Sequence, residues 1–195
     1  MNLKNVFLIV LFTSFCLNVS AKVDSKNKQG VFMSQSHPND VLLKSRMDLD
    51  KLVPVENIKT TEESDQQNEE ISKQLKILEE LYELPNLETG MRSAITDTYF
   101  QYFKKARELY VQSLNIGLKE SDVNEETLHY LIKDNTLSLY VVGMFNEQLT
   151  KEFLQPVITN TVFTLGFEKI FIVNPKSSFK YIMTEQEWKK TLKNK

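Results

Sequence analysis

Cysteine and histidine are scarce in this chain. Its 195 residues include one cysteine, Cys16, and two histidines, His37 and His129. Thiol catalysis, disulfide exchange and cysteine-ligated metal sites need thiolates that the chain beyond Cys16 does not have. The five glycines are isolated from one another, so no glycine-rich loop is present to hold a phosphate group. These shortages exclude the most easily recognised enzyme motifs.

Charge is almost balanced overall but uneven along the chain. The formal net charge of −2 excludes a globally basic nucleic-acid binder. Residues 48–84 hold eleven acidic residues against four lysines, a net charge of −7, and residues 167–195 hold seven lysines against three glutamates, a net charge of +4. Such polarity indicates either self-complementary assembly or partners at both ends, and the alternative is that both stretches are solvated surface.

Residues 1–21 have the three parts of a secretory signal peptide. Lys4 is followed by an apolar run to about Leu17, and Val19-Ser20-Ala21 is suited to cleavage after Ala21. The run is shorter than the roughly 20 residues that a membrane span needs, so an uncleaved anchor is the lesser alternative. Cleavage would remove Cys16 and leave a cysteine-free mature chain. We therefore expect an exported protein, periplasmic or extracellular, from a bacterium.

Residues 22–70 are predicted to form a flexible polar and acidic leader. Their apolar residues are scattered, and residues 60–70 contain none. Such a composition cannot bury enough surface to offset the entropy of ordering the chain. A short helical turn is expected near residues 40–43.

Apolar residues recur at helical spacing in residues 71–84 and again in residues 91–116, which predicts two helices. A third helix is predicted from Asp122, where Glu125 completes a capping-box pattern. Residues 136–155 are interpreted as a buried helix, with a strand over residues 137–142 as the alternative, because periodicity does not separate the two in a short apolar run.

Near the C-terminus the composition changes from that of helices to that of strands and turns. Residues 170–173 and 179–183 flank the turn-forming residues 174–178, which predicts a β-hairpin. Residues 157–165 are expected to add a third strand or to extend the preceding helix, and a capping box at Thr184 predicts a short final helix. The expected fold is a single α+β domain over residues 71–195, mostly helical with three to four helices, a small C-terminal hairpin or three-stranded meander, and a final helix.

Candidate chemistry is confined to one pair of side chains. On the predicted third helix Glu125 and His129 are four residues apart, so they would meet on one face and could bind a metal or act as a base and its orienting group. A metal site needs a third protein ligand, and no motif supplies it. We predict no catalytic, cofactor-binding or metal-binding residues, and we interpret the pair as ordinary surface.

The segment Val31-Phe32-Met33-Ser34-Gln35-Ser36-His37-Pro38 is similar, over these eight residues, to the VFxSxSxP opening of a periplasmic conjugative-transfer protein family. This resemblance implies a place in envelope machinery.

The favoured hypothesis is an exported, non-enzymatic interaction protein, an accessory subunit of an envelope or secretion/conjugation assembly. Protein partners are expected, without cofactor, nucleic acid or a stable membrane anchor after cleavage. The alternatives are a carrier of small apolar ligands, enclosed by the aromatic-rich helices, and an enzyme with a site near His129. The predicted partner contacts are Val31, Phe32, Phe100, Lys176, Lys180 and Trp188.

Overall fold

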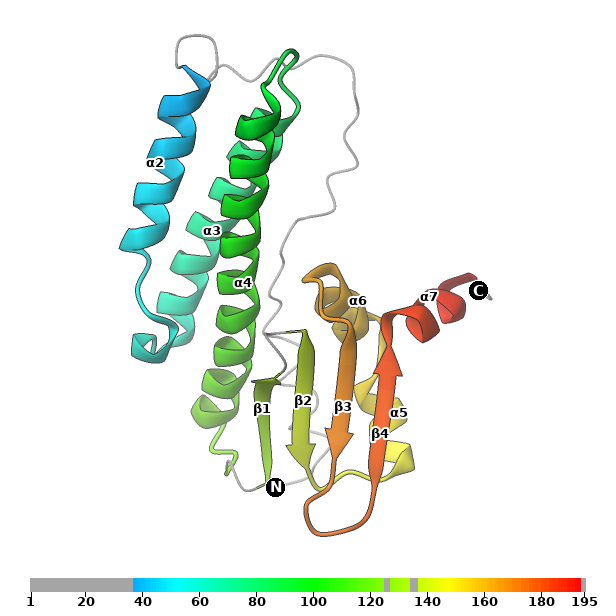
Figure 1. Cartoon of the computed structure of the whole chain (residues 1–195). Coiled ribbons are helices and arrows are strands. Elements are labelled where there is room, and N and C mark those ends of the chain that lie inside the picture. The colour runs from blue at the N-terminus through cyan, green and yellow to red at the C-terminus, as the bar shows by residue number, and fades with distance from the viewer. Residues whose placement is uncertain (1–36, 125–126, 134–136, 194–195) are drawn as a thin grey trace.

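The computed structural model describes residues 37–124, 127–133 and 137–193, so the predicted signal peptide and the first part of the predicted leader lie outside it. The described part is α+β and mostly helical, with a C-terminal hairpin and a short final helix, which confirms the predicted fold class (Figure 1). In chain order the elements are α2 (Pro38–Lys51), a 3-10 turn η1 (Val55–Asn57), α3 (Thr61–Tyr82), α4 (Thr89–Glu120), β1 (Leu128–Lys133), β2 (Ser138–Gly143), α5 (Glu147–Phe153), α6 (Pro156–Thr164), β3 (Lys169–Val173), β4 (Lys180–Thr184) and α7 (Glu185–Lys193).

Helices α2, α3 and α4 form a bundle in which each contacts the other two, and a four-stranded sheet lies beside the C-terminal half of α4 (Figure 1). The strand order is β1-β2-β3-β4. Strands β1 and β2 are antiparallel, β2 and β3 are parallel, and β3 and β4 are antiparallel. Parallel neighbours need a crossover connection. Here α5 and α6 supply it between β2 and β3.

The prediction of a flexible leader is wrong for residues 38–70, which form α2, η1 and the first half of α3. A capping box starts α3: the Thr60 hydroxyl accepts from the Glu63 amide, and the Glu63 carboxylate accepts from the Thr60 amide. Polar side chains occupy the buried face of this part of the helix, and the Gln67 amide donates to the Val53 carbonyl at 3.0 Å. A search for apolar periodicity does not detect a helix that buries polar groups in this way.

Helix α2 is attached to the other two helices by the buried Leu42 and by a network of polar contacts. The Tyr102 hydroxyl on α4 donates to the backbone carbonyl of Ser45 at 2.6 Å, and the Ser45 hydroxyl donates to Gln74 Oε1 on α3 at 3.0 Å. The Gln74 amide nitrogen donates in turn to Asp48 and Glu70, at 3.3 and 3.0 Å. Tyr102 is fully buried, and this burial raises the pKa of its phenol. The network fixes the position of α2 because buried polar groups must be paired.

Two further helix predictions, both in the second half of the chain, are wrong. Residues 128–133 are strand β1 and not part of a helix that starts at Asp122. Residues 138–143 are strand β2, as the alternative interpretation held, and the predicted helix is present only at its end, as α5. Residues 156–164 form helix α6, which Pro156 opens at its first turn, rather than a third strand.

Gly166 ends α6 where that helix meets α4. Its φ is +73°, and its amide and that of Phe167 donate to the carbonyls of Phe163 and Val162. A Cβ at this position would lie 3.2 Å from Arg107 Nη1 and 3.2 Å from the ring of Phe103. Glycine is therefore required both by the left-handed backbone and by the close approach of α4.

Replacing Tyr102 tests the polar attachment of α2. We expect Tyr102→Phe to lower the free energy of unfolding by about 1 kcal/mol and to speed hydrogen exchange in α2, because the bond to Ser45 is lost. Tyr99→Phe is the matched control, since the exposed Tyr99 hydroxyl bonds Glu79 at 2.9 Å and its loss should cost less than about 0.5 kcal/mol. Equal effects of the two substitutions in urea unfolding and exchange would contradict the account.

Gly90 in α4 and Gly166, which follows α6, give a second matched pair. Gly166→Ala should destabilise the protein by about 1–2 kcal/mol, because alanine is strained at positive φ and its Cβ would crowd Arg107 and Phe103. Gly90→Ala should instead stabilise it by up to about 1 kcal/mol, because this helical position has open space for a Cβ. Thermal unfolding of both variants checks the opposite signs.

Candidate interaction surface

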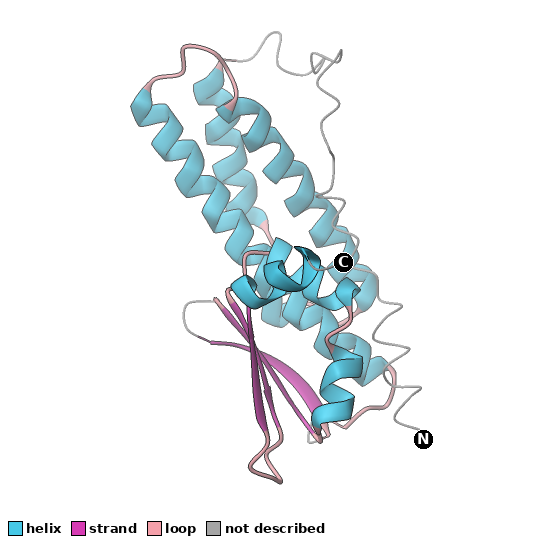
Figure 2. Cartoon of the chain, turned by 90° about the vertical axis from the view of Figure 1, so that its right-hand side faces the viewer, coloured by secondary structure: helices cyan, strands magenta, loops and turns pink. Residues whose placement is uncertain are grey.

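The sheet has one face that is covered by helices. On this face the side chains of β1, β2 and β3 are almost completely buried, at 1% exposure or less for Tyr130, Leu139, Val141, Ile170 and Ile172. The ring of Tyr130 stacks on that of Phe153 in α5. Helices α5 and α6 lie behind the sheet in Figure 1, and Figure 2 shows the same arrangement from the side. The covered face therefore belongs to the core.

The free edge of β1 is occupied by a side chain of α4. The Asn115 amide nitrogen donates to the Tyr130 carbonyl, and the Asn115 amide oxygen accepts from the Tyr130 N–H, both at 2.9 Å. Asn115 thus pairs with β1 as a strand residue would. This contact fixes the sheet against the end of α4.

The opposite face, which we term the open face, carries three rows of side chains. Directly paired residues of neighbouring strands point to the same side of a sheet. The register therefore aligns Leu131, Tyr140, Phe171 and Ile182, one from each strand, in a central row. One flanking row is Lys133, Ser138, Lys169 and Thr184, and the other is His129, Val142, Val173 and Lys180.

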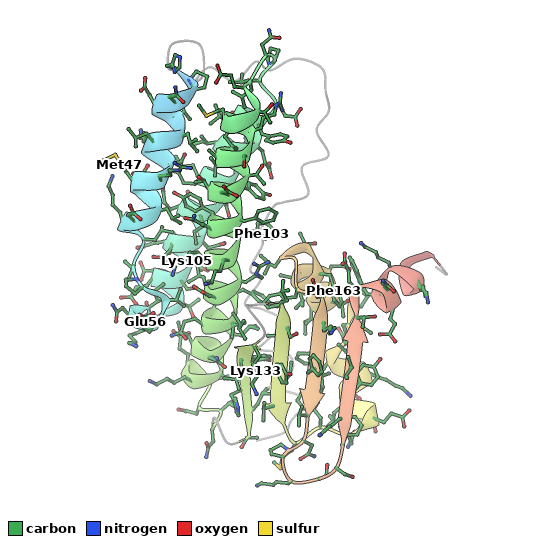
Figure 3. All side chains as sticks on the ribbon, viewed as in Figure 1. Met47, Glu56, Phe103, Lys105, Lys133 and Phe163 are labelled. Atoms are coloured by element: carbon green, nitrogen blue, oxygen red, sulfur yellow. The ribbon has the colours of Figure 1, made fainter. Side chains whose placement is uncertain are left out.

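The central row is apolar along its whole length, yet its ends reach solvent. Leu131 is 40% exposed and Ile182 is 49% exposed. Between them the rings of Tyr140 and Phe171 stack almost parallel, with their centroids 4.6 Å apart and an angle of 5° between the planes. The Lys133 ammonium, labelled in Figure 3, lies 4.6 Å from the centroid of Tyr140. The row is thus an ordered apolar strip that crosses the sheet.

Charge on the open face has one sign. Of its twelve residues three are lysines, Lys133, Lys169 and Lys180, and one is His129, whereas none is Asp or Glu. Lys133 and Lys169 lie on one side of the central row, and Lys180 lies on the other. An apolar strip with basic residues on both sides suits a ligand that combines apolar and acidic groups.

The predicted partner contacts are distributed over several parts of the molecule. Lys180 lies on the open face, and Lys176 is exposed in the turn between β3 and β4. Phe100 lies on α4, and it is 61% exposed, as its place off the apolar stripe suggests. Val31 and Phe32 lie outside the described residues.

Trp188 holds α7 against α6. Its ring stacks on Phe163, labelled in Figure 3, at 5.0 Å between centroids, and its Nε1 donates to Asn160 Oδ1 at 3.1 Å. The amide and hydroxyl of Thr184 donate to Glu187 at the start of this helix, which lowers the pKa of that carboxyl. Trp188 is only partly exposed in this position.

The suggested helical pair of Glu125 and His129 does not exist in that form. His129 lies in β1 on the open face, and Glu125 lies outside the described residues. Among the residues described, no cluster of three or more Asp, Glu, His or Cys side chains is arranged to hold a metal ion. In the same part of the chain, no helix combines the length and the hydropathy that crossing a membrane requires.

The central row was missed by sequence reasoning. Residues 137–145 are apolar almost throughout, so the sequence predicts a segment that is buried on all sides. Tyr140 and Phe171 share the open face only because β2 and β3 pair in a particular register. Residues 170–173 are apolar throughout, so no local alternation marks Phe171 or Tyr140 as lying on an exposed face.

Comparison with known protein families, with curated proteins and with solved structures finds no match to this chain.

Two isoleucines on neighbouring strands test which face of the sheet is covered. Ile172 is fully buried on β3, and Ile182 is 49% exposed on the open face of β4. We expect Ile172→Ala to lower the free energy of unfolding by about 2–5 kcal/mol, and Ile182→Ala to lower it by about 1 kcal/mol or less. Urea denaturation measures both, and a larger loss for Ile182→Ala would show that this face is packed.

Proposed function

We propose that this protein is an exported, non-enzymatic interaction protein that binds another protein through the open face of its sheet. The observation that carries the proposal is the central row, an apolar strip with an ordered aromatic stack and solvent-exposed ends. Protein interfaces typically have an aromatic-rich apolar centre and a polar rim. The open face has this composition in a pre-formed state, on strands that the core holds in place.

The cellular setting in the proposal rests on the N-terminal residues. The pattern of Lys4, an apolar run and Ala21 supports export and cleavage after Ala21. The resemblance of residues 31–38 to the opening of a conjugative-transfer family supports a place in an envelope or secretion/conjugation assembly. The protein is then an accessory subunit that binds a component of this assembly.

The open face is the size of the centre of a protein interface and not of a whole one. Four strands about 4.8 Å apart and three rows about 7 Å apart give a face of a few hundred Å², of which the central row is the apolar part. Burying the exposed parts of Leu131 and Ile182 would add stabilisation of about 25 cal/mol per Å². The stacked rings need no reordering on binding, which lowers the entropic cost of the complex.

Site-specific photo-crosslinking in cells tests the proposal. A photoreactive amino acid at Leu131 should give a discrete adduct with a protein partner, identified by mass spectrometry, because this side chain lies at the exposed end of the central row. Ile182→Glu in the same chain should abolish the adduct, because a carboxylate would interrupt the apolar strip.

The matched control places the photoreactive group at Val157, which is 60% exposed on α6, a helix on the covered side of the sheet. This position should not give the same adduct. No adduct from Leu131, or the same adduct from both positions, would contradict binding through the open face.

A further inference from the structure

Strand β4 forms the outer edge of the sheet, and its outer side is almost free of hydrogen bonds. On its inner side it pairs with β3 alone. Within the described part of the chain, the one β4 amide with a partner on the outer side is that of Thr184, which donates to the Glu187 carboxylate at 2.8 Å. The opposite edge differs, because Asn115 occupies it. The sheet therefore has one edge to which a further strand can be added.

The hydrogen bond that closes the β3–β4 turn shows which residues face this free edge. The Asn174 amide donates to the Phe179 carbonyl at 3.1 Å. Hydrogen-bonded pairs alternate along two antiparallel strands, so two residues further on Tyr181 again bonds β3. The N–H and C=O groups of Lys180 and Ile182 therefore point outward, and no described residue pairs with them.

The side chains of β4 near this edge are apolar and exposed on both faces of the sheet. Ile182 ends the central row of the open face and is 49% exposed, and Tyr181 on the covered face is 38% exposed. An exposed apolar edge is a template for pairing with another strand. A strand added here would lengthen the central row by one residue, opposite Ile182, and would cover Tyr181. Both its backbone and its apolar side chains would therefore find partners.

Basic side chains without ion pairs lie next to the free edge. Lys180, on the open face of β4, and Lys176, in the β3–β4 turn, are exposed. Neither forms an ion pair with a described residue, whereas Lys51, Lys151 and Lys189 on the helices each pair with a carboxylate at 2.5–2.8 Å. The rows of the open face contain no acidic residue. A segment that pairs with β4 is thus matched in charge when it carries a carboxylate opposite Lys180.

Helix α7 limits what can lie along β4. It begins directly after Thr184 and extends beyond the free edge of the sheet (Figure 1). A second copy that paired its own β4 antiparallel with this one would bring its β3–β4 turn against α7. A single extended segment alongside residues 180–183 ends before this helix. The edge therefore suits a short segment of a partner protein and not the sheet of a second copy.

We infer that the partner protein contributes a short extended segment that pairs with β4 as a fifth strand of the sheet. An acidic residue of this segment lies opposite Lys180, and an apolar residue two positions away lies opposite Ile182. In such β-strand addition, backbone hydrogen bonds supply affinity and alternate side chains supply specificity. The inference rests on the proposed function, in which the open face binds protein, and it specifies the segment of the partner that the edge recognises.

Selection from a display library of random linear peptides, on the immobilised purified protein, tests the inference. The enriched peptides should share an acidic residue two positions from an apolar one. When the best of these peptides is added, hydrogen exchange of the Ile182 amide should slow at least about tenfold, because this amide is unpaired in the free protein. Enrichment of basic peptides, or no enrichment at all, would overturn the inference.

Ile182→Pro separates backbone pairing from side-chain contact. Proline removes the outward N–H and leaves the bonds to β3, so this variant should keep the fold. It should bind the selected peptide about tenfold more weakly than Ile182→Val, which keeps both the amide and an apolar side chain. Equal binding by the two variants would overturn the inference.

Lys180→Glu tests the charge without altering the backbone. Selection on this variant should enrich a basic residue in place of the acidic one, and the peptide selected on the parent should bind about threefold more weakly or worse. Lys119→Glu is the matched control, since Lys119 is exposed at the end of α4 and has no ion pair among the described residues. It should keep the acidic preference. An acidic preference that persists in Lys180→Glu would overturn the inference.

The crosslinking from Leu131 separates this inference from the proposed function. A partner adduct that Ile182→Pro abolishes and Ile182→Val preserves supports both. An adduct that persists in Ile182→Pro overturns the added strand and leaves the proposed function standing. Dimers of the purified protein that Ile182→Pro dissociates would make a second copy the occupant of the edge and would overturn the inference. With no adduct at all from Leu131, both fall.

Discussion

The structure depends on the one-sided coverage of a four-stranded sheet. Strands β2 and β3 are parallel neighbours, so the chain must cross from the end of one to the start of the other. Both helices of this crossover, α5 and α6, lie on one side of the sheet, and the Asn115 side chain anchors β1 to the end of α4. The described helices thus build a core on one face only. The same topology leaves Leu131, Tyr140, Phe171 and Ile182 aligned on the other face.

The helices α2, α3 and α4 are stabilised by different interactions from those that stabilise the sheet. The sheet is held by apolar packing, whereas α2 combines the buried Leu42 with a chain of hydrogen bonds from Tyr102 through Ser45 to Gln74. Buried polar networks of this kind specify one arrangement, because any other leaves polar groups unpaired. Helix α2 also presents two apolar side chains to solvent, those of Leu43 and Met47. The molecule therefore carries two exposed apolar strips, one at each end.

The sequence predicts the parts of this fold whose buried faces are apolar and periodic. The stripe from Ile95 to Leu114 indicates α4, and the β-branched run at residues 170–173 with the turn that follows it indicates the hairpin of β3 and β4. Helix α2 and the start of α3 were missed because polar groups such as Ser45 and Gln67 fill their buried positions. The open face could not be predicted in the same way, since the pairing of Tyr140 with Phe171 is a property of strand register and not of local pattern.

The central claim is that the open face is accessible in the isolated protein and occupied in the cell. The most direct measurement is the rate at which a maleimide labels Ile182→Cys in dilute purified protein and in intact cells, with Val157→Cys as the reference position and the unsubstituted chain as the background for Cys16. The account predicts rapid labelling of both positions in dilute solution and selective protection of residue 182 in cells. Equal labelling of the two positions in cells would contradict it.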